Sequence, residues 1–105
     1  AKPILTPEAF DGRDDLVILD TRTATEAAPE HFDGSVQIHS GRVRWRADEL
    51  PRDAGILTHC VSGGRSAVAA SVLRHLGYGP VYELKGSWVG WEQYQAAKGA
   101  EATPA

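Results

Sequence analysis

The sequence has little of what would indicate several specialised classes of protein. Cys60 is its only cysteine, which excludes an internal disulfide and a zinc site built on several thiolates. No apolar run approaches the roughly 20 residues that a membrane-spanning helix needs, and no signal peptide is visible at the start. The 11 basic and 14 acidic side chains leave a net charge of −3, too small to indicate a nucleic-acid or membrane partner. We therefore expect a soluble, cytoplasmic protein with neither kind of partner.

The order of apolar and polar segments predicts the fold class. The length of 105 residues fits one small domain with its own core, and we expect a monomer. Short apolar runs, at residues 4–5, 16–19, 35–38, 56–59 and 81–84, alternate with segments of helical pattern. We predict one α/β domain over residues 1–98, with a mostly parallel central sheet flanked by helices on both faces. A flexible tail is expected at residues 99–105.

Local signals mark several helices between these strands. Thr6 followed by Pro7 is typical of a helix start, and Thr23 with Glu26 three residues later fits a capping box. Apolar side chains recur at helical spacing in two further segments, residues 41–50 and 66–76. A last helix is expected from Ser87, with its two tryptophans, Trp88 and Trp91, in the core.

The segment between the fourth strand and the strongest helix carries the chemistry. Its residues are Cys60, Val61, Ser62, Gly63, Gly64, Arg65 and Ser66. Two glycines let the backbone curl and turn its N–H groups inward, and the next helix points its positive end at the same place. Such a cradle lowers a thiol pKa and binds an anion. We predict Cys60 and Arg65 as catalytic residues and the other five as substrate-binding residues.

A lone cysteine is more often a small buried hydrophobic side chain than a nucleophile. Here a buried strand, a Cys-x4-Arg loop and a helix follow one another directly. Because each of these parts serves the same anion-binding purpose, the arrangement favours the nucleophile over the buried hydrophobe.

Four motifs, in the same order, resemble those of the rhodanese (sulfurtransferase) family. They are the loop of residues 60–66, Asp20-Thr21-Arg22 with Glu26, the segment His31-Phe32-Asp33-Gly34-Ser35, and Leu84-Lys85-Gly86-Ser87 ending at Trp91. The likeness covers roughly residues 3–95. It implies a single rhodanese-like domain that transfers sulfur without a metal or other cofactor.

The resemblance also implies a double-displacement reaction. The Cys60 thiolate would take the outer sulfur of a small donor, thiosulfate or glutathione persulfide, and hold it as a persulfide. A thiol acceptor, a sulfur-carrier protein or cyanide would then remove that sulfur. Loop N–H groups would stabilise the persulfide anion, while Arg65 would hold the loop and contribute its positive charge.

Three positions depart from the family pattern and leave the preferred donor open. Val61 stands where many members carry a charged or polar side chain that helps bind thiosulfate, Ser87 replaces a glycine, and Glu30 replaces a glycine before the histidine. The Ser-Gly-x-Arg-Ser ending of the loop also resembles rhodanese domains fused to persulfide dioxygenases.

Two other functions remain open at this point. Cysteine-type phosphatases and arsenate reductases share the strand, loop and helix, but their loop has one more residue between cysteine and arginine than the Cys60-x4-Arg65 spacing. A relay or interaction module that exchanges sulfur with a single protein partner would have the same sequence features as a general sulfurtransferase.

Other polar residues are expected to have structural roles. His59 precedes the thiol on a strand and should point to the opposite face, and Asp20 with Arg22 should form an ion pair. The remaining histidines, His31, His39 and His75, lack the spacing of metal ligands. Four arginines surround Trp45 and are expected to form a solvated face: Arg42, Arg44, Arg46 and Arg52.

Overall fold

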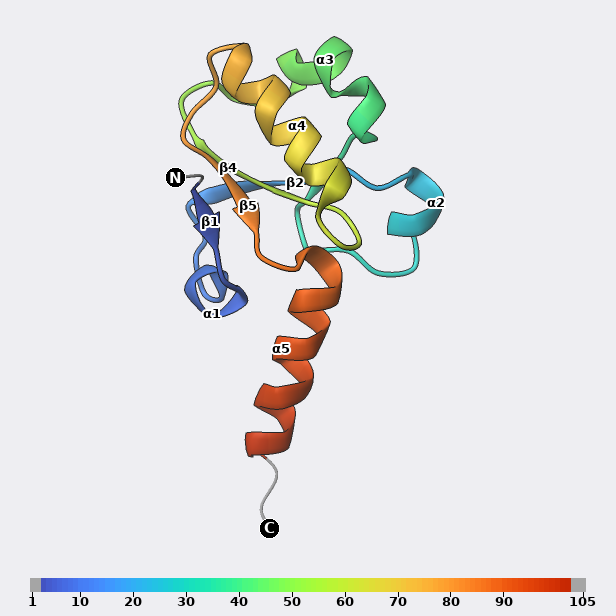
Figure 1. Cartoon of the computed structure of the whole chain (residues 1–105), viewed down its shortest axis with the longest axis vertical. Coiled ribbons are helices and arrows are strands. Elements are labelled where there is room, and N and C mark those ends of the chain that lie inside the picture. Colours follow the sequence, from blue (N-terminus) through green and yellow to red (C-terminus); the bar gives the residue numbers. More distant parts are fainter. Residues whose placement is uncertain (1–2, 103–105) are drawn as a thin grey trace.

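A computed structural model describes residues 3–102, with side chains described up to residue 99 (Figure 1). Its five strands form one sheet in the order β1-β5-β4-β2-β3. They are β1 (Ile4–Leu5), β2 (Leu16–Asp20), β3 (Val36–Gln37), β4 (Gly55–His59) and β5 (Val81–Leu84). Every pairing is parallel, which confirms the predicted α/β class. Since parallel strands end at the same edge of a sheet, β4 and β2 deliver their last residues side by side.

Helices cover both faces of the sheet, as predicted. They are α1 (Pro7–Phe10), α2 (Ala24–Ala27), α3 (Val43–Arg46), α4 (Gly64–His75) and α5 (Ser87–Ala102), with two 3₁₀ turns, η1 (Ser40–Arg42) and η2 (Ala47–Glu49). In Figure 1, α3 and α4 lie on one side of the sheet and α1 and α5 on the other. Each side has its own buried cluster, one around Ile56 and Leu73 and one around Leu57, Leu84 and Phe10.

The predicted helix starts are confirmed in atomic detail. The Thr6 side chain accepts a hydrogen bond from the Ala9 N–H at 3.1 Å. In the capping box, the Glu26 carboxylate accepts from the Thr23 N–H at 2.9 Å, and the Thr23 hydroxyl accepts from the Glu26 N–H at 3.3 Å. Satisfying these free N–H groups lets two very short helices begin at fixed residues.

The prediction of a single helix over residues 41–50 is wrong. The segment is instead η1, α3 and η2 in succession. The Tyr78 hydroxyl donates to the Ala47 carbonyl oxygen at 2.5 Å, and the Leu50 N–H bonds the same oxygen at 2.9 Å. Val43, Ala47 and Leu50 are all buried, so the apolar spacing was a correct guide to burial but not to helical continuity.

Two helix boundaries also differ from the prediction. α4 begins at Gly64, two residues before the predicted start. α5 continues to Ala102, past the point where the flexible tail was expected to begin; the tail residues 103–105 lie outside the described residues. Among the described helices, none is long and apolar enough to cross a membrane.

Candidate active site

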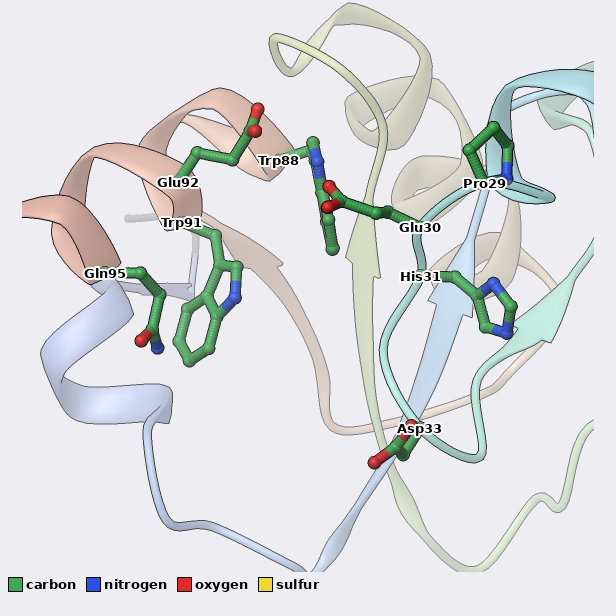
Figure 2. Close-up of a pocket in the computed structure, with 8 residues that line it drawn as sticks. All are labelled: Pro29, Glu30, His31, Asp33, Trp88, Trp91, Glu92 and Gln95. Carbon is green, nitrogen blue, oxygen red and sulfur yellow. The ribbon is translucent and has the colours of Figure 1, made fainter.

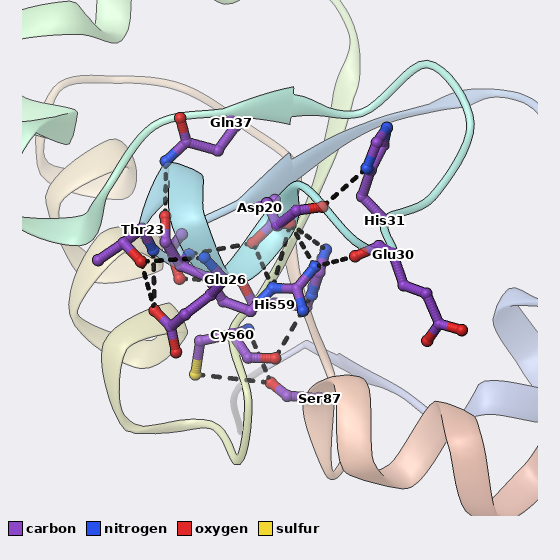
Figure 3. A network of polar contacts seen from close by, with 12 residues as sticks. Asp20, Thr23, Glu26, Glu30, His31, Gln37, His59, Cys60 and Ser87 are labelled. Atoms are coloured by element: carbon purple, nitrogen blue, oxygen red, sulfur yellow. Dashed lines mark hydrogen bonds and ion pairs between the residues drawn. The ribbon is translucent and has the colours of Figure 1, made fainter.

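The predicted loop joins the end of β4 to the start of α4, with Cys60 at its first position. Cys60 is buried, and its N–H donates to the Ser87 hydroxyl at 3.1 Å. Gly63 has a φ of 122°, a conformation that a side chain would strain. This conformation turns the Gly63 N–H back toward the thiol, at 3.0 Å from the Cys60 Sγ. Figure 3 shows Ser87, at the start of α5, facing the sulfur atom of Cys60.

Polar groups surround the sulfur atom. Besides the Gly63 N–H, the Ser66 hydroxyl lies 3.6 Å from the Cys60 Sγ and the Ser87 hydroxyl 3.9 Å from it. Burial by itself raises the pKa of Cys60, but hydrogen bonds from Ser66, Gly63 and Ser87 outweigh it and lower that pKa to about 7. A large fraction of the thiol is therefore ionised at neutral pH, the state in which cysteine acts as a nucleophile.

Ser87 is the site residue that sequence reasoning did not assign. It is fully buried and has a φ of 51°, in the region that favours glycine. A non-glycine residue held there indicates a conformation imposed by its surroundings. The signal was present in the sequence, because Ser87 occupies a position where the family pattern has a glycine.

The start of α5 is joined to the loop by backbone hydrogen bonds. The Trp88 N–H donates to the Cys60 carbonyl at 3.0 Å, and the Val89 N–H donates to the Val61 carbonyl at 3.1 Å. The first N–H groups of a helix have no partner within the helix. Here two of them bind the loop, so α5 positions Ser87 beside the thiol.

Arg65 lies at the first turn of α4 but does not contribute a free charge. Its guanidinium forms two hydrogen bonds to the Glu26 carboxylate, at 2.6 and 3.0 Å. This ion pair, together with the Thr23 N–H, lowers the pKa of Glu26 to about 2. Arg65 therefore connects α4 to α2, and Glu26 largely balances its charge.

The other predicted loop residues have different surroundings. Ser66 is buried, and its hydroxyl also donates to the Gly63 carbonyl at 3.0 Å. Val61 is half-buried, whereas Ser62 and Gly64 are exposed. The structure thus brings Gly63 and Ser66 to the thiol, and leaves Ser62 and Gly64 at the surface of the loop.

A buried polar network lies beneath the loop. Asp20 and Arg22 form the expected ion pair at 2.7 Å. Burial lowers the pKa of His59 to about 4, so its ring is neutral at pH 7. Its Nδ1 lies 3.4 Å from the Cys60 carbonyl oxygen, and its ring packs against Phe32 and Trp88. These contacts are structural.

A pocket of about 580 Å³ opens beside the first turns of α5 (Figure 2). Its walls come from the segment after α2 and from α5: Pro29, Glu30, His31, Asp33, Trp88, Trp91, Glu92 and Gln95. We call it the tryptophan pocket. Both tryptophans are half-buried. Trp91 packs against the buried cluster around Leu57, as predicted, whereas Trp88 belongs to neither buried cluster of the described residues. Among the described residues, no group of three or more histidine, cysteine or carboxylate side chains could hold a metal.

Comparisons with known proteins agree with this geometry. The profile of the Rhodanese-like domain matches residues 8–94. A sulfurtransferase of Allochromatium vinosum is 31% identical over 81 residues, 77% of this chain and 76% of that protein. A thiosulfate sulfurtransferase of Pseudoalteromonas translucida is 30% identical over 93 residues, 89% of this chain and 88% of that protein.

The fold is also found among solved structures. A rhodanese-related protein of Thermoplasma volcanium superposes with a TM-score of 0.81 at 22% identity, covering 97% of this chain and 95% of that one. At that identity the likeness concerns the fold alone. The match of the family profile to most of the chain and the two sulfurtransferase relatives go further: this chain belongs to the rhodanese-like domain family.

Proposed function

We propose that the protein is a sulfurtransferase that carries sulfane sulfur as a persulfide on Cys60. The observation that supports this most directly is that the Gly63 N–H donates to the Cys60 sulfur and that the hydroxyls of Ser66 and Ser87 lie within 3.9 Å of it. These polar groups lower the pKa of the thiol to about 7, and they suit the negative charge of a persulfide. The predicted catalytic and substrate-binding loop residues keep these roles within the proposal.

The reaction consists of two displacements at sulfur. In the first, the Cys60 thiolate attacks the outer sulfur of the donor and forms a new S–S bond. The bond between that sulfur and the rest of the donor breaks, and the leaving group departs with the electron pair as a thiolate or as sulfite. In the second, an acceptor thiolate or cyanide attacks the outer sulfur of the persulfide, and Cys60 leaves as a thiolate.

Neither displacement needs a general acid, because each leaving group is stable as an anion near neutral pH. The surroundings of the thiol fit this requirement. His59, the nearest imidazole in sequence, is buried and neutral, with its pKa lowered to about 4. The site therefore acts by holding and stabilising sulfur anions rather than by transferring protons.

We further propose a low-molecular-weight persulfide, rather than thiosulfate, as the preferred donor. Thiosulfate carries two negative charges and is bound best beside a free cation. The Arg65 guanidinium is engaged with Glu26 at 2.6 Å, and the position after the nucleophile holds the apolar Val61. A persulfide places less negative charge in this cradle. The reducing cytoplasm, where such persulfides and a free thiol coexist, is the location we propose.

Intact mass spectrometry tests the proposal. The protein is incubated with thiosulfate and, separately, with glutathione persulfide, and its mass is measured before and after cyanide. We expect the gain of one sulfur atom, faster from the persulfide, that cyanide removes and that Cys60→Ser does not show.

Two other results would point elsewhere. If neither donor loads Cys60 but a sulfur-carrier protein does, the chain is a partner-dependent relay. If Cys60-dependent hydrolysis of para-nitrophenyl phosphate occurs without sulfur uptake, the protein is a phosphatase and the proposal fails.

A further inference from the structure

The tryptophan pocket begins on α5 at Trp88, one residue beyond Ser87. Ser87 contacts the Cys60 Sγ, and Trp88, Trp91 and Gln95 line the pocket at successive helical turns. An α-helix rises about 1.5 Å per residue, so the Cα of Glu92 lies about 7.5 Å further along α5 than that of Ser87. A small molecule whose sulfur meets Cys60 can therefore extend its other end into this pocket.

The unbalanced charges that line the tryptophan pocket are negative. Both arginines of the site are paired, Arg65 with Glu26 and Arg22 with Asp20. In contrast, the pocket is rimmed by three carboxylates whose side chains form no hydrogen bond or ion pair with any described residue: Glu30, Asp33 and Glu92. A cation is favoured in the pocket, and an anion is repelled.

The aromatic walls point to a cation independently of the carboxylates. The Arg22 guanidinium already lies over the Trp88 ring, 4.8 Å from its centroid. The Trp91 ring contacts other aromatic rings and packs against the buried cluster that contains Leu57, and no described cation lies over it. Figure 2 shows this ring on the α5 side of the pocket, below Glu92 and beside Gln95. An indole ring that lines a pocket is a favourable site for an ammonium group.

We propose that the sulfur acceptor is a small thiol that carries a protonated amine, which binds in the tryptophan pocket. This inference rests on the proposed function of Cys60. The amine lies against Trp91 and between the carboxylates, and it keeps its proton throughout. The acceptor thiolate forms an S–S bond with the outer sulfur of the Cys60 persulfide, and Cys60 departs with the electron pair of the broken bond.

The dimensions of a short aminothiol fit this placement. The outer sulfur lies about 2 Å from the Cys60 Sγ, and an attacking sulfur approaches to about 3.5 Å. Two carbons and a nitrogen add about 4 Å of reach. The ammonium group then lies about 9 Å from the Cys60 Sγ, comparable to the rise of about 7.5 Å from Ser87 to Glu92 along α5.

Acceptor preference gives the first test. The Cys60 persulfide is prepared, and its loss of sulfur is followed with cysteamine, 2-mercaptoethanol and thioglycolate, which are cationic, neutral and anionic. Each rate is divided by that of the same thiol with free glutathione persulfide, which corrects for thiol reactivity. We expect cysteamine to exceed 2-mercaptoethanol about tenfold and thioglycolate to be the slowest.

Variants that neutralise carboxylates then show which residues cause the preference for cysteamine. In Asp33→Asn/Glu92→Gln, the cysteamine to 2-mercaptoethanol ratio should fall to about one, because the attraction for the amine is lost. Glu8→Gln/Asp14→Asn removes the same charge from exposed positions outside the pocket, and its ratio should match that of the unsubstituted protein. Equal ratios in both double variants, or no preference in the unsubstituted protein, would overturn the inference.

A binding measurement separates this inference from the proposed function. Butylammonium and butanol, at constant ionic strength, are added to the Cys60→Ser protein, and the indole N–H signal of Trp91 is followed by NMR. We expect a saturable shift with butylammonium alone. If neither probe shifts the signal, or if an oligolysine peptide shifts it and butylammonium does not, the small-amine pocket is refuted. A butylammonium shift without any sulfur uptake by Cys60 would refute the proposed function and leave the cation pocket standing.

Discussion

At the scale of single residues, the state of the Cys60 thiol follows from the groups around it. Burial opposes ionisation, but hydrogen bonds from Ser66, Gly63 and Ser87 to the sulfur favour it, and the pKa falls to about 7. Removing one hydroxyl group would change this pKa, and one unit of pH changes the fraction of the thiol that is ionised. Both changes can be measured on the thiol itself.

The rate of alkylation by iodoacetamide should rise with a midpoint near pH 7, against about 8.5 for an ordinary thiol. Because the pKa of Cys60 is lower in the folded than in the unfolded state, ionisation stabilises the fold. That stabilisation is complete above the unfolded value and is lost as the pH falls through about 7. Unfolding of the unsubstituted protein, compared with Cys60→Ser, should show this difference. An alkylation midpoint at or above 8.5 would mean that the loop does not activate the thiol.

Ser87 should affect both the thiol and the stability of the fold. Ser87→Ala removes the acceptor of the buried Cys60 N–H, which should cost about 1–3 kcal/mol, and it should raise the pKa of Cys60 by removing a donor to the sulfur. Ser87→Gly loses the same hydroxyl but relieves the φ of 51°. We therefore expect both variants to be alkylated more slowly at pH 7, with Ser87→Gly the more stable in urea. A lower stability for Ser87→Gly would show that the backbone at this position is not strained.

The sequence indicated some of these residues and not others, for physical reasons. Cys60 and its loop follow a local pattern of strand, glycines and helix, which sequence alone contains. Ser87 lies 27 residues away from Cys60, and only the parallel arrangement of β4 and β5 brings it to the thiol. The pairing of Arg65 with Glu26 likewise spans 39 residues, so the balance of its charge could not be judged from the loop.

At the scale of elements, the junction of β5 and α5 is packed too tightly at Gly86 and Gly90 to hold a Cβ atom there. A Cβ on Gly90 would lie 2.6 Å from the Lys85 carbonyl oxygen, and one on Gly86 would lie 2.9 Å from the Gly90 Cα. These two glycines let the first turn of α5 fold back over the end of β5. That turn holds Ser87 against Cys60.

Gly90→Ala should therefore act against ordinary helix propensity. In an open helix the change would stabilise by about 1 kcal/mol, but here the clash with backbone should destabilise the protein by about 1–3 kcal/mol. It should also slow alkylation of Cys60 by displacing Ser87. Gly99→Ala, in the same helix with no atom within 4 Å of the new Cβ, is the control and should not destabilise. If the two variants behave alike under urea unfolding, the close packing at Gly90 has no energetic weight.

Helices and strands were predictable where residues close to them in sequence determine them. Capping residues and continuous apolar runs placed α1, α2 and the strands, because those signals lie within a few residues of what they determine. Residues 41–50 failed because a distant side chain, Tyr78, takes part of the hydrogen bonding of the segment. The end of α5 was missed because the turn before it is held by the residue that follows α1: the Asp11 carboxylate accepts from Tyr94 and from Lys98, each at 2.7 Å.

At the scale of the whole molecule, β4 connects the two faces of the sheet. Ile56 belongs to the cluster under α4, and Leu57, the next residue, belongs to the cluster beneath α1 and α5. Both are fully buried. The same strand ends at the Cys60 loop. We infer that the two clusters and the site are stabilised together, as one cooperative unit.

Leu57→Ala tests this coupling. Removing a fully buried leucine side chain from the central strand should cost about 2–5 kcal/mol, a large part of the roughly 5–15 kcal/mol of a small domain. Trp91 packs against the Leu57 cluster, so tryptophan fluorescence reports that face once the exposed Trp45 of α3 is replaced in a Trp45→Phe background, while circular dichroism follows all helices. In Leu57→Ala, both signals should move to the same lower urea midpoint. The control is Val68→Ala, at a side chain 57% exposed, which should change the free energy of unfolding by no more than about 0.5 kcal/mol. If fluorescence changed at a lower urea concentration than circular dichroism, the α5 face would unfold separately, and β4 would not join the two faces into one unit.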